Sequence, residues 1–99
     1  MQATVEIVHF RLVADATKDG FLLANQEVTA WVQKQTGFIS RQLCLSDENV
    51  WSDIVVWDSP QSAKIAANNF IEVLGPSDFM RMIEFSSVQM SHQAVLASC

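Results

Sequence analysis

The chain has 99 residues and a formal net charge of −5; 49% of its residues are hydrophobic and 17% are charged. This length predicts a single domain over residues 1–99, and the hydrophobic content excludes a disordered chain. The acidic balance and the lack of any basic cluster argue against nucleic acid or an anionic membrane surface as a partner.

The first half of the chain predicts a strand, a helix and a second strand. Residues Thr4 to Leu12 are rich in Val, Ile and Phe and predict the first strand. Thr17 is a candidate N-cap for a helix from Lys18 to Thr36, in which apolar residues recur at helical spacing until Gly37 ends it. Residues 38–45 predict the second strand.

The second half repeats this pattern in the order strand, helix, strand. A hairpin loop at residues 46–49 leads to a third strand over 50–57, and Asp58-Ser59-Pro60 then supplies an N-cap oxygen and a proline suited to a helix start. We expect helices over 60–74 and 77–83 and a last strand over 87–94. The order β-α-β-β-α-β predicts a ferredoxin-like α+β fold, with a four-stranded antiparallel sheet and the helices on one face.

The two faces of the predicted sheet can be assigned by pairing Leu45 with Val50 across the hairpin. Neither face is then plainly polar, and the charged fraction is low against the ~25% of typical domains. We therefore expect helices on one face and a second copy of the chain on the other, giving a homodimer through sheet-on-sheet contact. In this pairing one face carries Ile39, Arg41, Leu43, Leu45, Val50, Ser52, Ile54 and Val56, and the other carries Phe38, Ser40, Gln42, Cys44, Trp51, Asp53, Val55 and Trp57.

The location of the protein is inferred from its first residues and its cysteines. MQATVEIVHF lacks the basic and long apolar segments of an export signal, so we expect a cytoplasmic protein with Cys44 and Cys99 as free thiols. No apolar run approaches the ~20 residues that span a bilayer, which argues against a membrane protein.

Three segments carry a resemblance to a known family: HFRL at 9–12, TGFISRQL at 36–43 and WSDIVVWDSPQSA at 51–63. With the element order, they resemble the antibiotic biosynthesis monooxygenase-like domains of the dimeric α/β barrel superfamily. The resemblance implies a dimeric barrel and oxidation of a small planar aromatic or quinol without metal, haem or flavin.

Residue by residue, the resemblance holds only in part. Trp57 matches a tryptophan that ends strand three in the polyketide-tailoring oxygenases, but Asp53 stands where those enzymes have asparagine. Their relay tyrosine has no counterpart, because the chain contains no tyrosine. Haem-degrading members need a histidine in the helical region, and Pro60 to Glu84 contains none.

Asp53 and Trp57 are the candidate catalytic residues. Asp53 either serves as a general base on a phenol or is a carboxylate paired with a nearby Arg or Gln. Trp57 and Trp51 either stack on a flat substrate or pack in the core or an interface. Asn25 falls on the inner arc of the first helix, where a polar group hydrogen-bonds within the core or faces a cavity.

The remaining candidates complete a ligand site between sheet and helices. Ser40 and Gln42 share the face assigned to Asp53, so we expect this face to border the cavity; Phe70 lies on the inner arc of the second helix. His9 and His92, on neighbouring strands, are either proton donors and acceptors or structural residues. Two histidines without a carboxylate cluster make no metal site. Arg41 and Arg11 are each expected to form an ion pair with the other subunit rather than to bind substrate.

Two functions remain open at this level. The first is a homodimeric, cofactor-independent monooxygenase. The alternative is a non-catalytic homodimer that binds a small ligand or a partner protein, which the missing tyrosine and the Asp53 departure favour. An accessible, apolar cavity around Asp53 would indicate the enzyme, and a salt-bridged Asp53 the alternative.

Overall fold

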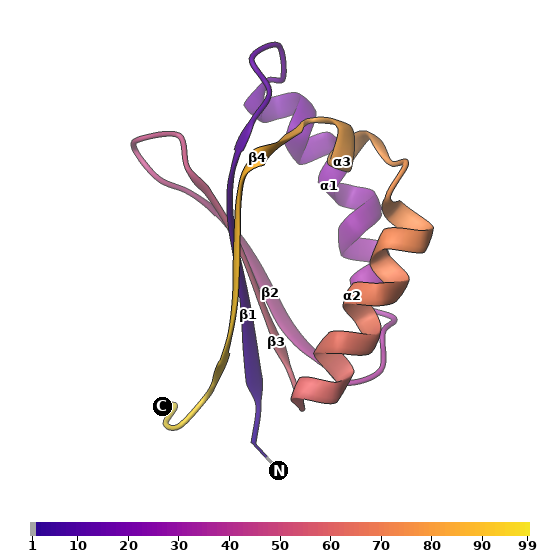
Figure 1. The fold of residues 1–99 in the computed structure, drawn as a ribbon, viewed down its shortest axis with the longest axis vertical. Helices are drawn as coiled ribbons and strands as arrows, with labels where there is room; N and C mark the ends of the chain where they lie inside the picture. Colours follow the sequence, from indigo (N-terminus) through magenta and orange to yellow (C-terminus); the bar gives the residue numbers. More distant parts are fainter. Residues whose placement is uncertain (1) are drawn as a thin grey trace.

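A computed structural model describes residues 2–99 and confirms the ferredoxin-like α+β fold. Four strands form one antiparallel sheet in the order β2-β3-β1-β4: β1 (Thr4–Leu12), β2 (Phe38–Leu45), β3 (Trp51–Trp57) and β4 (Ile83–Ala94). The helices α1 (Lys18–Val32), α2 (Pro60–Leu74) and α3 (Asp78–Arg81) all lie on one side of the sheet (Figure 1).

The helix starts follow the predicted capping residues. Thr17 accepts a hydrogen bond from the Gly20 amide at 3.0 Å, and Ser59 accepts one from the Ser62 amide at 3.1 Å, with Pro60 in the first turn. Each cap satisfies an amide that has no partner within its helix. The local signals at residues 17 and 59 therefore set where both long helices begin.

The first helix ends earlier than the predicted Thr36. After Val32 the chain tightens into turns in which the amides of Lys34 and Gln35 donate three residues back, to Trp31 and Val32, and the Gln35 side chain also donates to the Trp31 carbonyl. These bonds satisfy the free carbonyls of the last helical turn. They lead into Gly37, which adopts φ = +84°.

The last strand is longer than predicted and begins at Ile83 rather than Ser87. Glu84 pairs with Arg11, after which the register shifts, and the Ser87 hydroxyl accepts the Arg11 amide hydrogen at 2.8 Å. A serine side chain thus replaces a strand-to-strand bond at this irregularity. The predicted strand over 87–94 therefore lacked its first four residues, Ile83 to Ser86.

The register of β2 is the main correction to the sequence analysis. Leu45 pairs with Trp51, not Val50, because the hairpin loop spans residues 46–50 and Asn49 adopts φ = +65° within it. A shift by one residue moves every side chain of a strand to the other face. A second irregularity, between Phe38 and Ser40, returns Phe38 to the face of Trp57.

The helix-covered face therefore combines the β3 residues of one predicted face with β2 residues of the other, so that Arg41 lies beside Asp53 in place of Ser40 and Gln42. Residues directly opposite in the ladder share a face. The rows on this face are Phe38–Trp57–Thr4–Ala94, Arg41–Val55–Glu6–His92, Leu43–Asp53–Val8–Met90 and Leu45–Trp51–Phe10.

The free face presents three rows to the outside of the chain. Its centre, on β1 and β3, is mainly apolar, while the edge strands β2 and β4 contribute mostly polar side chains. The rows are Ser40–Val56–Val5–Gln93, Gln42–Ile54–Ile7–Ser91 and Cys44–Ser52–His9–Gln89.

The core fills the space between sheet and helices in two clusters. One surrounds Phe21 and Trp51 near α3, and the other joins Trp57 and Val55 to Ala63 and Ala66 of α2. The two small alanines let α2 approach the sheet beside the large indole of Trp57. Leu43 packs against the first cluster and Phe38 against the second.

Candidate functional site

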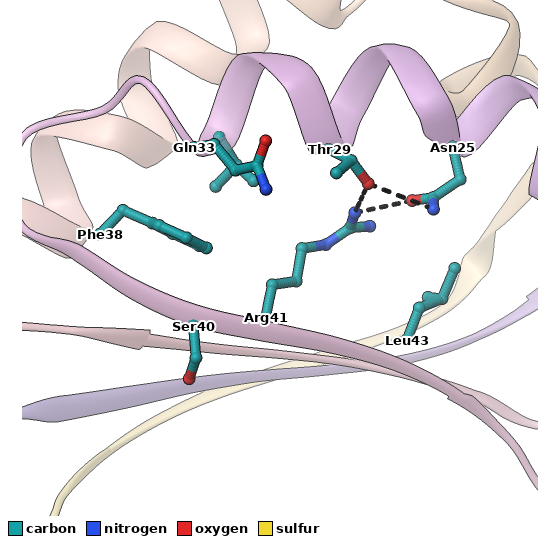
Figure 2. A pocket seen from close by; sticks show the side chains of 8 residues that line it. Asn25, Thr29, Gln33, Phe38, Ser40, Arg41 and Leu43 are labelled. Carbon is teal, nitrogen blue, oxygen red and sulfur yellow. Dashed lines mark hydrogen bonds between the residues drawn. The ribbon is translucent and has the colours of Figure 1, made fainter.

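A pocket of about 360 Å³ lies between α1 and β2, at the edge of the sheet (Figure 2). Its volume is within the range of ~300–1,000 Å³ typical of small-molecule sites. Polar groups from α1 face Arg41 in its middle, and apolar side chains flank them. The lining residues are Asn25, Thr29, Val32, Gln33, Phe38, Ser40, Arg41 and Leu43.

Arg41 is the centre of the polar part of this pocket. Its side chain is only 7% exposed and is hydrogen-bonded to two elements, β3 and α1. Nε and Nη2 donate to the two oxygens of Asp53 on β3 at 2.9 and 2.8 Å. Nη1 donates to Asn25 Oδ1 at 2.7 Å and to Thr29 Oγ1 at 3.3 Å on α1.

An aromatic ring also contacts the Arg41 guanidinium. The Phe79 ring centroid, from α3, lies 5.8 Å from Arg41 Cζ, within cation–π range. The bidentate bond to Asp53 and this ring together fix the plane of the guanidinium. Arg41 is therefore a pre-positioned charged donor inside the fold, and the expected intersubunit ion pair of Arg41 is wrong.

Asp53 is salt-bridged, as one of the two predicted alternatives stated. Its side chain is 15% exposed, both of its oxygens accept bonds from Arg41, and it is not among the pocket-lining residues. Leu43 and Val8 flank it in the sheet. Asp53 therefore acts on the pocket indirectly, by holding Arg41, which lines it.

The two tryptophans that flank Asp53 are buried. Trp51, 4% exposed, stacks with Phe10 at a centroid distance of 6.5 Å and meets Phe21 edge-on at 4.8 Å. Trp57, 2% exposed, meets Phe38 edge-on at 6.0 Å, and its Nε1 is buried without a hydrogen-bond partner within residues 2–99. Phe38, and neither tryptophan, lines the pocket.

Asn25 lies where its helical position predicts. It is half-buried, lines the pocket, and binds Arg41 and Thr29. Ser40 and Gln42 do not lie on the face of Asp53, because the corrected register places both on the free face. Ser40 borders the pocket, but its side chain points away from α1 (Figure 2).

His9, His92 and Phe70 all lie outside the pocket lining. His9 is on the free face with Nδ1 2.8 Å from Ser52 Oγ, and His92 is on the other face with Nε2 2.9 Å from Glu6 Oε2. The two histidines are on neighbouring strands, as predicted, but on opposite sides of the sheet. Phe70 packs edge-on against Trp31 at 5.6 Å.

Sequence reasoning missed Arg41 and Thr29 as pocket residues. With the correct register, Arg41 and Asp53 are opposite charges on the same face of neighbouring strands, a pairing that stabilises sheets. Thr29 follows Asn25 by four residues and so shares its side of the helix. The pattern was available in the sequence once the hairpin loop was read as residues 46–50.

Residues 2–99 offer neither a metal site nor a membrane-spanning helix. Across residues 2–99, no group of three His, Cys, Asp or Glu side chains is placed to hold a metal ion together. None of the described helices has the length and apolar character needed to cross a bilayer.

Solved structures share this fold over nearly the whole chain. SnoaB, a cofactor-independent oxygenase from Streptomyces nogalater, matches with a TM-score of 0.68 at 16% identity, over 100% of this chain and 96% of that one. A Shewanella loihica protein, provisionally described as a monooxygenase, gives 0.70 at 17% identity over 99% of both chains.

A third structure links the fold to a named group of proteins. A Chloroflexus aurantiacus protein, provisionally assigned as an antibiotic biosynthesis monooxygenase, gives a TM-score of 0.71 at 13% identity over 98% of this chain and 96% of that one. No family model and no curated protein matches the sequence. These comparisons confirm the fold expected from the resemblance.

Proposed function

We propose that this chain, which has the fold of the antibiotic biosynthesis monooxygenases, oxidises a small planar aromatic or quinol with molecular oxygen in the pocket between α1 and β2. The observation that supports the proposal is the pairing of a buried, fixed cation, Arg41, with apolar pocket walls. Neither metal nor flavin is needed in this scheme.

The chemistry follows from what such a substrate supplies. Once it loses a proton, its carbanion or phenolate passes electrons to oxygen; one oxygen atom stays in the product and the other leaves as water. Arg41 stabilises the negative charge that develops on the substrate oxygen, and Asn25 orients that oxygen. Phe38 supplies an aromatic wall in place of Trp57.

The proton acceptor in this scheme is Asp53. Each of its oxygens accepts one bond from Arg41 and keeps a second lone pair. Because Asp53 does not line the pocket, the proton reaches it through one water molecule. The net charge of the cluster is unchanged by this transfer, since the new substrate anion replaces the carboxylate charge.

A non-catalytic, ligand-binding role is the second candidate. The salt bridge between Arg41 and Asp53 favours it, because both carboxylate oxygens already accept bonds that hold a structural cation. In that case the pocket binds the same class of flat molecule without turnover.

Under either function we propose a homodimer formed through the free face of the sheet. Val5, Ile7, Ile54 and Val56 form its apolar centre, and polar residues of β2 and β4 surround them. An apolar centre with a polar rim is the usual composition of a protein interface. A second copy seated there would complete the dimeric barrel implied by the resemblance.

An oxygen-uptake assay separates the two functions. We expect the parent protein to consume oxygen with anthrone-like or hydroquinone substrates above the rate in protein-free buffer. Asp53→Asn should lower this rate by ~100-fold or more, the usual contribution of a positioned base. Asp47→Asn, in the exposed hairpin loop, is the matched control and should keep the parent rate. Saturable binding without uptake would leave only the non-catalytic role.

A further inference from the structure

The polar wall of the pocket, formed by Arg41, Asn25 and Thr29 with Asp53 behind them, keeps several hydrogen-bond donors unused. Asp53 accepts two bonds from Arg41, Asn25 Oδ1 accepts one, and Thr29 Oγ1 accepts from both Arg41 and Asn25 Nδ2, the last at 3.4 Å. Arginine has five N–H groups, and four of them are used in these bonds. Within residues 2–99, one Nη2–H, one Nδ2–H of Asn25 and the Thr29 O–H remain available to a ligand.

The orientation of the Asn25 amide is fixed by Arg41. A guanidinium only donates, so the amide must turn its oxygen toward Nη1, as the 2.7 Å contact shows. The amide NH₂ group then points to Thr29. The donor excess on this wall therefore follows from the position of one cation.

The charge of the same wall is balanced. Arg41 and Asp53 form a one-to-one pair, and among residues 2–99 no other charged side chain lines the pocket. A neutral ligand oxygen can accept the remaining donors without disturbing this balance. A ligand carboxylate would add a second negative charge beside Asp53, in a chain that already carries −5.

We infer that Arg41, Thr29 and Asn25 form a carbonyl-binding subsite that selects flat, uncharged ketones or quinones over hydrocarbons and carboxylates. The carbonyl oxygen takes the free donors, and the rings lie against Phe38, Val32 and Leu43. In the binding of the carbonyl group Asp53 acts as a positioning residue, since it holds the guanidinium and cancels its charge. The inference deepens the proposed function, because it names the ligand class of that pocket.

The test uses three probes of one shape: fluorenone, fluorene and fluorene carboxylate. Their affinities are measured by calorimetry or equilibrium dialysis, together with the Arg41 Nε–H signal in nitrogen-edited NMR spectra. The parent protein should bind fluorenone ~10-fold more tightly than fluorene, the value of one hydrogen bond to a charged donor. Fluorenone should shift the Arg41 signal more than fluorene does. Fluorene carboxylate should bind more weakly than fluorenone.

Two variants test whether the side chains of Thr29 and Asp53 cause the preference for fluorenone. Thr29→Val removes one donor and should lower the fluorenone-to-fluorene ratio about threefold, whereas Thr36→Val, the same change at an exposed site, should not. Asp53→Asn leaves Arg41 with an unbalanced charge, so it should raise the affinity for fluorene carboxylate by about tenfold. A purely structural Asp53 would not change the order of the probes in this way.

The outcomes are distinguishable from those of the oxygen assay, because fluorenone binds without being oxidised. Equal affinities for fluorenone and fluorene, a preference of the parent for the carboxylate, or no saturable binding of any probe would overturn the subsite. Oxygen uptake with no ketone preference would overturn the subsite alone. A ketone preference without oxygen uptake on any substrate would support the subsite and overturn the oxygenase.

Discussion

Arg41 on β2 and Asp53 on β3 form a bidentate ion pair beneath the helices, with donor–acceptor distances of 2.9 and 2.8 Å. Charges removed from water in this way are stable only while both are present. The pair therefore links the stability of the fold to the chemistry of the pocket.

Removing one partner of this pair should be costly, and removing both should not. Arg41→Met is expected to lower the free energy of unfolding by about 3 kcal/mol, because Asp53 is left charged and unpaired. Combining it with Asp53→Leu should recover most of that loss. Urea unfolding measures both.

The exposed ion pair between Arg81 and Asp78 provides the control. Both side chains are about two-thirds exposed, so Arg81→Met should change stability by less than about 0.5 kcal/mol. Equal losses for the Arg41 and Arg81 variants would contradict a special role of the buried pair.

Phe38 should matter more to ligand binding than Trp57. Phe38→Ala removes a pocket wall and should weaken fluorenone binding about tenfold, by loss of ~1.5 kcal/mol of aromatic contact. Trp57→Phe keeps an aromatic ring behind Phe38 and removes the unpartnered Nε1, so binding should stay within about twofold of the parent. A larger loss of fluorenone affinity in Trp57→Phe than in Phe38→Ala would show that Trp57, and not Phe38, contacts the ligand.

The free face should carry the subunit contact. Ile54→Lys places a charge at its apolar centre and should turn the dimer, about twice 11.0 kDa, into a monomer by size-exclusion light scattering. Gln61→Lys introduces the same charge on the exposed start of α2 and should leave the mass unchanged. A monomeric parent protein would refute the interface directly.

Asn49 should be sensitive to its backbone conformation. At φ = +65°, Asn49→Ala should lower the free energy of unfolding by about 1 kcal/mol, since the left-handed region is unfavourable for most side chains. Asn49→Gly should be nearly neutral. Chemical denaturation of the two variants gives the comparison, and identical stabilities would show that the loop does not depend on this residue.

Most of the fold could be predicted because its signals are local. Thr17 and Ser59 mark the starts of the long helices by capping, and alternating apolar residues mark the strands. The single-domain assignment stays a prediction. Strand and helix ends deviated where side chains replace backbone bonds, as at Ser87 and Gln35.

The site was harder to predict because it depends on register, which is not local. The loop at 46–50 and the irregularity between Phe38 and Ser40 each shift β2 by one residue. At Phe38 the two shifts cancel, so its assignment to the face of Trp57 was correct. Between the two irregularities only one shift applies, so Arg41, Ser40 and Gln42 were assigned to the wrong faces. Asn25 was placed correctly, since helical periodicity alone decides its direction.

The length of the β2–β3 hairpin loop thus determines which side chains of the edge strand β2 face the helices and which face outward. Arg41 and Leu43 face the pocket, while Ser40, Gln42 and Cys44 face outward only because the loop has its present length. Deleting one residue from this loop would exchange the two sets: the pocket would lose its cation, and the outer face would gain it. A change far from any ligand would then abolish binding and introduce a charge where a second chain should dock.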